Sequence, residues 1–467
     1  STFPMTCRSF SLRIIPSLLT RTACVLKVVY PRTGKPPSMG NAKPVKLVLL
    51  ILFGLAGIAH GAPGIYLRPV FEKSANGIFH ENKEVHFGFE LNNQLKDPVE
   101  VKVVWQVSTD QKKLVIKSNP STIKIPVDEK RVASYAAKIP GPGFYKSTIT
   151  CSWEGGRVTK TVQVGYGPEK LLPPLTTESD FQKFWNESRA SLKKVDPQYR
   201  LIHQPELSKG ELNVYEVSMR SFGNIRVRGW YEVPKSKGPH PVILRVPGYG
   251  GNMKSIARFK DMIVFSFNPR GHGNSQEDIK GKPSNFWIRG LDNKEGYYYQ
   301  GAYLDCVRAL DFLYSRKEVD PKRIAVAGGS QGGGLSLSTA ALDSRISLCA
   351  PHIPFLTNWD LYFKTSHWPE MDKWIEAKES RTWQSTLKTM SYFDTMNMAP
   401  WIKCPLFMGV GLQDSICPPV TCFAVYNRVK GKKEYLVYPL AKHSVDKSHH
   451  QLVFNWMREK FGLKSSR

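Results

Sequence analysis

The chain has 467 residues, of which 41% are hydrophobic and 11% aromatic, and its formal net charge is +27. This length predicts two globular parts with additional ends, and the composition, with no repeat of fixed period, excludes a disordered chain and a solenoid. The basic charge could concentrate an anionic substrate or wall polymer, or it could simply form a solvated surface. No recognisable nucleic-acid-binding motif accompanies it, so we expect no nucleic-acid partner.

A hydrophobic run near the amino-terminal end, LVLLILFGLAGIA, occupies residues 47–59 and follows two lysines. It is too short to span a bilayer comfortably, and the small residues at 59–62 suit cleavage after export. We therefore predict a secretory signal peptide over residues 39–61, with Met39 as the true start and residues 1–38 as an upstream segment without function. The mature protein would be secreted or periplasmic, without stable insertion in a membrane. A longer leader or a retained membrane anchor is the alternative.

The next stretch alternates apolar and polar residues with period two between Asn, Asp, Pro and Gly turns. Six or seven short strands at this spacing predict an immunoglobulin-like β-sandwich over residues 62–168, followed by a linker at 169–175. Its aromatic residues, such as Trp105 and Trp153, could line a sugar site, but packing in the core is favoured. The strand-like runs include VHFGFEL, VEVKVVWQVS, STIKIPV, RVASYAAKI, GFYKSTITCSW and VTKTVQVGY.

Residues 176–467 alternate apolar β runs with helical stretches. Strands that are apolar nearly throughout are typical of a parallel sheet buried on both faces, so we predict an α/β fold with a mostly parallel sheet flanked by helices. In such sheets, functional loops lie at the carboxyl ends of the strands. The predicted strands are VILRVP at 242–247, DMIVFSFN at 261–268, RIAVAGG at 323–329, PLFMGVG at 405–411 and EYLVYP at 434–439.

The strongest local motif is G-x-S-x-G, present as Gly328-Gly329-Ser330-Gln331-Gly332 between a predicted strand and a predicted helix. A serine on such a sharp turn needs small neighbours, and the helix directs its first N–H groups towards negative charge on a substrate. A phosphate-binding loop is excluded in its standard form, because no Gly-Lys-Ser/Thr follows. We interpret Ser330 as a nucleophile; the alternative is a plain glycine-rich turn.

A serine nucleophile needs a base and an acid that orients this base, in the chain order Ser, acid, His for this fold. Asp414 follows the strand at 405–411, and His443 follows the strand at 434–439, so both would lie at the same sheet edge. Asp414 could instead be only a turn residue. Other histidines fit less well: His449 and His450 lie farther beyond the last strand, whereas His272, His352 and His367 precede the acid.

An oxyanion hole requires a second backbone N–H besides that of Gln331, supplied by the loop after an early strand. The sequence Val246-Pro247-Gly248-Tyr249-Gly250-Gly251 is that loop, and we predict the N–H of Tyr249 as the donor, with its ring beside the acyl pocket. A plain turn between two elements is the alternative. The predicted site needs no metal, and no CxxC pair or HExxH motif is present.

With these positions assembled, residues from about 176 to 461 resemble carbohydrate esterase family seven, the acetyl xylan esterases and cephalosporin C deacetylases. The resemblance rests on VPGYGG, PRGHGNS, GYYYQGAYLDCVRALDFL, GGSQGGG and YFDTMNMAPWIKCPLFMGVGLQDSICPPVTCFAVYN, in that order. It implies an α/β-hydrolase fold, a Ser330, Asp414 and His443 triad, an oxyanion hole at Tyr249 and Gln331, and supporting roles for Gly328, Gly332, Arg270 and Gly271.

The resemblance also implies removal of short acyl groups, chiefly acetyl, from sugars and related alcohols, without a cofactor and frequently in homo-oligomers. Two positions depart from the family pattern: His272 stands where the family usually has Gln, and Ser444 where it has Glu. The six cysteines after residue 61 fix no disulfide pairing by their spacing.

Three other functions stay open. A prolyl-oligopeptidase-like peptidase shares the serine loop, but its propeller would need about 300 residues or more, and only about 100 precede the α/β part. An acyl-CoA thioesterase or acyltransferase can also join a β-sandwich to this fold. A non-enzymatic polysaccharide-binding protein is the alternative from another class.

Overall fold

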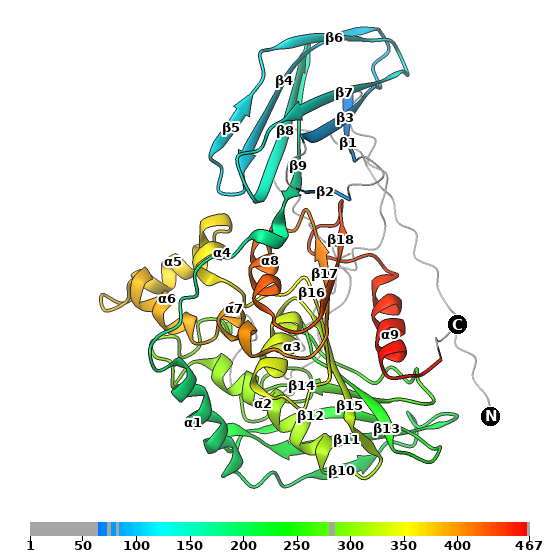
Figure 1. The fold of residues 1–467 in the computed structure, drawn as a ribbon, viewed down its shortest axis with the longest axis vertical. Helices are drawn as coiled ribbons and strands as arrows, with labels where there is room; N and C mark the ends of the chain where they lie inside the picture. Colours follow the sequence, from blue (N-terminus) through cyan, green and yellow to red (C-terminus); the bar gives the residue numbers. More distant parts are fainter. Residues whose placement is uncertain (1–63, 72–75, 81–83, 280–284, 465–467) are drawn as a thin grey trace, which may run out of the picture. The chain divides into compact units, whose positions relative to one another are not determined.

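The computed structural model describes residues 64–71, 76–80, 84–279 and 285–464. The predicted signal peptide and the segment before it lie outside these residues. The described chain contains an all-β part followed by an α/β part (Figure 1). Among the described residues, none of the helices has the length and apolar character that crossing a bilayer requires.

The all-β part contains two sheets that enclose one apolar core. One sheet has the order β1-β3-β7, and the other has the order β2-β9-β8-β4-β5, with β6 also paired to β4. In β3 every second residue is buried, as expected for a strand with one face in a core. The strands are β1 (Ile65–Val70), β2 (Ile78–Phe79), β3 (Val85–Asn93), β4 (Val99–Thr109), β5 (Leu114–Lys117), β6 (Ser121–Ile125), β7 (Lys130–Ala137), β8 (Gly143–Trp153) and β9 (Gly156–Tyr166).

The two tryptophans considered as sugar ligands pack in or against this core. Trp105 is 4% exposed, stacks on Tyr135 with ring centroids 4.7 Å apart, and donates its indole N–H to the Ser147 hydroxyl at 2.8 Å. Trp153 is partly buried against the same core. Their contacts are those of structural residues.

The α/β part is built on a nine-stranded sheet of order β10-β11-β12-β14-β13-β15-β16-β17-β18. The first three strands are antiparallel to their neighbours, and the strands from β14 to β18 in this order are parallel. The strands are β10 (Arg200–His203), β11 (Leu212–Arg220), β12 (Arg226–Pro234), β13 (His240–Arg245), β14 (Ile263–Asn268), β15 (Val319–Gly329), β16 (Leu348–His352), β17 (Leu406–Gly411) and β18 (Lys433–Tyr438).

Helices cover both faces of this sheet (Figure 1). On β13, Val242 and Leu244 face the core that includes the helices α1, α2, α3 and α8, whereas Ile243 faces the smaller core under α9. The predicted α/β-hydrolase fold is confirmed, and the all-β part that precedes it has two sheets around one core, as a β-sandwich does. The helices are α1 (Phe181–Lys193), α2 (Tyr298–Tyr314), α3 (Gln331–Leu342), α4 (Trp359–Thr365), α5 (Pro369–Glu376), α6 (Trp383–Ser391), α7 (Thr395–Met398), α8 (Pro419–Arg428) and α9 (His449–Lys460), with 3-10 turns η1 (Pro168–Lys170), η2 (Phe222–Asn224) and η4 (Ala399–Trp401).

Candidate active site

Ser330 lies at the turn between strand β15 and helix α3. Its backbone has φ 57° and ψ −122°, a strained conformation for a residue with a side chain. Several backbone hydrogen bonds hold this conformation: the Ser330 N–H donates to the carbonyl of His352 at 3.0 Å, and the Ser330 carbonyl accepts from Gly333 and Phe355 at 2.9 Å each. The turn is therefore fixed from both sides.

The glycines of the motif are required by close packing against the loop after β13. A Cβ atom at Gly332 would lie 2.5 Å from the carbonyl oxygen of Val246, and one at Gly328 would lie 2.7 Å from the same oxygen. Both distances are shorter than any real contact, so neither position can carry a side chain without moving backbone. This packing brings the predicted oxyanion loop against the serine turn.

The structure brings Ser330, His443 and Asp414 into one hydrogen-bonded chain. His443 Nε2 lies 3.0 Å from Ser330 Oγ, and His443 Nδ1 lies 2.8 Å from Asp414 Oδ2. The Asp414 side chain is fully buried, and its other oxygen accepts the N–H groups of Ile416 and Cys417 at 2.8 and 2.9 Å. Because the carboxylate accepts a hydrogen bond from Nδ1–H, the proton stays on Nδ1 and the lone pair of Nε2 faces the serine hydroxyl.

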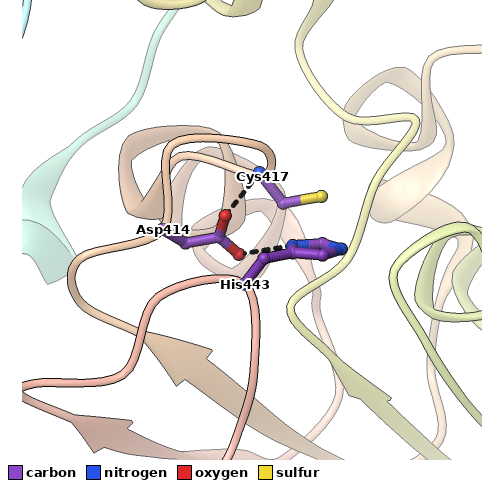
Figure 2. A group of neighbouring side chains, drawn as sticks. All are labelled: Asp414, Cys417 and His443. Carbon is purple, nitrogen blue, oxygen red and sulfur yellow. Dashed lines mark hydrogen bonds and ion pairs between the residues drawn. The ribbon is translucent and has the colours of Figure 1, made fainter. Parts of the chain in front are cut away.

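Figure 2 shows Asp414 and His443 beside the thiol of Cys417. Single donor atoms of these three side chains lie within 4.8 Å of one another, a spacing that could suit a cation. Burial and the nearby Asp414 charge raise the pKa of Cys417 well above its usual range, so its thiol stays protonated and is a poor metal ligand. Both Asp414 oxygens already accept hydrogen bonds. The donor set therefore fits a histidine-orienting carboxylate better than a metal site.

The other histidines considered from the sequence have different partners. His449 Nδ1 lies 2.8 Å from the Tyr438 hydroxyl, and the exposed His367 lies 3.3 Å from a carboxylate oxygen of Asp372. Among the described residues, His443 is the histidine whose side chain is hydrogen bonded to Ser330.

Tyr249 and Ser330 share the lining of a cavity of about 310 Å³. The Tyr249 hydroxyl accepts the backbone N–H of Trp287 at 3.3 Å, which fixes the tyrosine ring as one wall. A second wall is an aromatic pair, Trp287 and Trp368, with ring centroids 4.9 Å apart. The lining residues are Tyr249, Trp287, Ser330, Phe355, Trp368, Glu370 and Ile416. The hydroxyl of Ser330 thus faces a small, mainly apolar pocket.

His272 connects the two predicted oxyanion segments through its side chain. Its Nε2 accepts the side-chain amide of Gln331 at 3.0 Å and the backbone N–H of Gly250 at 3.3 Å. Its Nδ1 lies 3.2 Å from the carbonyl oxygen of Arg270, which fixes the proton on Nδ1. Burial lowers the pKa of His272, so the imidazole is neutral and can act as an acceptor. Tyr299 completes the chain by donating its hydroxyl to Gln331 Oε1 at 2.9 Å.

Arg270 supports the same loop through a buried ion pair. Its guanidinium makes two hydrogen bonds to Asp305 of α2, at 2.8 and 2.9 Å, and Asp305 also accepts the Arg270 backbone N–H at 2.9 Å. Gly271 has φ +77°, and a Cβ there would lie 2.3 Å from the ring of Phe286. Asp305 was not singled out from the sequence, since it belongs to no recognisable motif.

The six cysteines after residue 61 are free thiols, five of them buried and Cys404 partly exposed. The buried thiols are Cys151, Cys306, Cys349, Cys417 and Cys422. They act as small core side chains.

Comparison with known proteins identifies the family. Residues 170–460 match the family model of acetyl xylan esterases. An acetyl esterase of Xylanibacter ruminicola, Axe7A, is 27% identical over 378 residues, covering 78% of this chain and 83% of the relative. The structure of an acetyl xylan esterase from Paenibacillus sp. R4 aligns with TM-score 0.59 and 34% identity, covering 62% of this chain and 98% of that chain. Acetyl xylan esterase 1 from Thermoanaerobacterium sp. JW/SL YS485 aligns with TM-score 0.57 and 28% identity over 62% and 97% of the two chains. The chain therefore belongs to the acetyl xylan esterase family, hydrolases that act on ester bonds.

Proposed function

We propose that this protein removes acetyl groups from acetylated carbohydrates, with Ser330 as nucleophile, His443 as general base and Asp414 as the orienting acid. The observation that carries the proposal is the hydrogen-bonded chain from Asp414 through His443 to the hydroxyl of Ser330. The names of the related acetyl esterases support the choice of acyl group and substrate class.

The geometry supports a two-step reaction. His443 Nε2 takes the proton of Ser330 as Oγ attacks the ester carbonyl, and the N–H groups of Tyr249 and Gln331 hold the oxygen that becomes negative. The imidazolium then gives the proton to the departing alcohol, leaving an acetyl group on Ser330. Water, deprotonated by His443, attacks this acyl-enzyme and releases acetate.

The cavity at Ser330 supports preference for a short acyl chain. Its aromatic walls, Tyr249, Trp287 and Trp368, hold one another in place, so they would resist the displacement that a long chain requires. A methyl group fits such an apolar pocket, and an acyl chain long enough to reach these rings would have to move one of them.

Export is part of the proposal. The predicted signal peptide at 39–61 would bring the enzyme to polysaccharides outside the cytoplasm. Expression of the full chain with fractionation tests this point: the processed protein should appear outside the cytoplasm, and a full-length cytoplasmic product would contradict it.

The function is tested with Ser330→Ala and p-nitrophenyl acetate. Hydrolysis should fall to the background rate, while circular dichroism and urea unfolding stay as in the wild type. Ser338→Ala is the matched control, because this serine lies farther along α3 and donates to the carbonyl of Leu335 at 3.0 Å. Full residual activity in Ser330→Ala would overturn the assignment.

A further inference from the structure

A second, larger cavity is lined in part by His443, the proposed general base. Its volume is about 950 Å³, and it shares no lining residue with the pocket at Ser330. The two cavities approach each other at three places. Gly248 and Gly329 line the larger one, whereas their chain neighbours Tyr249 and Ser330 line the smaller one, and His443 lines the larger one while its Nε2 contacts Ser330. The larger cavity therefore begins at the reacting centre.

The cavity exists because a connecting helix is missing. Strands β13 and β14 are parallel neighbours, and a crossover between such strands usually contains a helix that packs on the sheet. Residues 246–262, which connect them, form no helix. Among the described residues, α9 is the helix that packs on this face, so the sheet beside it stays open. Ala327 and Ala350 of the sheet form part of the cavity lining.

The lining carries positive charge from two arginines, Arg245 and Arg258. Three histidines also line it, His352, His443 and His450, and none of the described residues in the lining is acidic. Burial and the positive charges of the two arginines lower the pKa of His450.

Neither arginine has a carboxylate partner among the ion pairs of the described residues. Arg245 donates to the Ser266 hydroxyl at 2.9 Å, and Arg258 contacts the amide oxygen of Gln451 and stacks over the ring of Phe454 at 4.9 Å. Burial lowers the pKa of Arg245, and the negative charge of Glu232, which lies outside the lining, opposes this effect. The two oxygens of Glu232 already accept the N–H groups of Ile256 and Ala257 at 2.7 and 2.6 Å.

We propose that this cavity binds the carboxylate of an acidic sugar, a uronate, that belongs to the alcohol part of the ester substrate. Guanidinium groups match a carboxylate in charge and shape, and Phe454, Val453 and Met253 offer the apolar surface on which a sugar ring can lie. His443, which gives its proton to the departing alcohol, also lines the cavity, so an alcohol part bound beside this histidine can extend into it. This inference rests on the proposed function and names its substrate class.

The test compares two acetylated methyl glycosides that differ in one group, a glucuronoside and a glucoside, with p-nitrophenyl acetate as a substrate without sugar. The wild type should have a kcat/KM for the glucuronoside about tenfold higher than for the glucoside. Arg258→Gln should remove most of this preference and leave p-nitrophenyl acetate hydrolysis unchanged. Arg258→Lys should keep part of it, because the charge stays. Arg200→Gln is the control of equal charge change, on the exposed strand β10.

Each other outcome has a definite meaning. Equal kcat/KM for the two glycosides, with normal hydrolysis of p-nitrophenyl acetate, overturns the uronate site and leaves the esterase intact. No hydrolysis of any ester refutes the proposed function itself. If free glucuronate changes p-nitrophenyl acetate hydrolysis while the two glycosides react equally, the cavity binds a separate carboxylate molecule and the substrate site is refuted.

Discussion

His272 links the two predicted oxyanion segments, because its Nε2 accepts from the side chain of Gln331 and from the backbone of Gly250. In His272→Leu the buried side-chain amide of Gln331 and the N–H of Gly250 lose their acceptor. A buried donor left without a partner costs about 1–3 kcal/mol, and the longer Gly250 contact adds less, so the free energy of unfolding should fall by about 2 kcal/mol.

The effect on catalysis follows from the same contacts. Gly250 adjoins Tyr249, and Gln331 adjoins Ser330, so releasing both allows the two predicted oxyanion N–H groups to separate. A loss of about 1.4 kcal/mol in the transition state corresponds to about tenfold in kcat/KM. His272→Gln is the matched variant, since the glutamine carbonyl oxygen can accept the same donors and should preserve most activity.

Urea unfolding and kcat/KM for p-nitrophenyl acetate measure both effects. The expected order of stability and of activity is wild type, then His272→Gln, then His272→Leu. A leucine variant as stable and as active as the wild type would refute the role of His272 in holding the oxyanion segments.

Asp414→Asn should lower kcat by about 10⁴-fold with the fold retained, because an amide stabilises the wrong imidazole tautomer; a loss below tenfold in a p-nitrophenyl acetate assay would argue against its role. Trp368→Ala should raise the ratio of p-nitrophenyl butyrate to acetate hydrolysis at least about tenfold by opening the acyl pocket, and an unchanged ratio would show that this ring is not a wall. Acid should destabilise the protein through two buried neutral histidines: burial and neighbouring imidazoles lower the pKa of His352 to about 3 and of His449 to about 4, from 6.5. The unfolded chain binds these protons first as the pH falls. The free energy of unfolding is therefore highest above pH 6.5 and decreases as the pH falls towards 4. The decrease is on the order of 3 kcal/mol for His449 alone. Urea unfolding at pH 7 and pH 5 measures this loss of stability, and His449→Gln should lose less between the two pH values than the wild type. An equal loss in the two proteins would contradict the role of His449 in the acid sensitivity.

The candidate triad could be predicted from sequence because each member follows a strongly apolar strand. Ser330, Asp414 and His443 come after β15, β17 and β18, and the carboxyl ends of parallel strands meet at one edge of the sheet. The positions of the predicted strands were right to within a few residues. Four strands were missed. The antiparallel strands β10, β11 and β12 were not predicted, nor was β16, because LCAPH is short and contains a proline in a run with no alternation.

Contacts between distant irregular segments could not be predicted. Trp287 and Trp368 lie in loops without periodicity, and their pairing depends on how these loops fold over the sheet. The partner of Arg270 is Asp305, a buried aspartate of α2 that no sequence motif distinguishes from the other polar residues of this helix. The cationic cavity depends on a helix that does not form between β13 and β14, and a missing element leaves no motif to recognise.

In the proposed mechanism Ser330 carries the acyl group during turnover. Rapid acid quenching of the enzyme during p-nitrophenyl acetate hydrolysis, followed by mass spectrometry of the peptide that contains Ser330, detects this intermediate. We expect a transient acetyl group on Ser330 that is absent in Ser330→Ala. Acetylation of a different residue at the rate of turnover, with Ser330 unmodified, would contradict this mechanism.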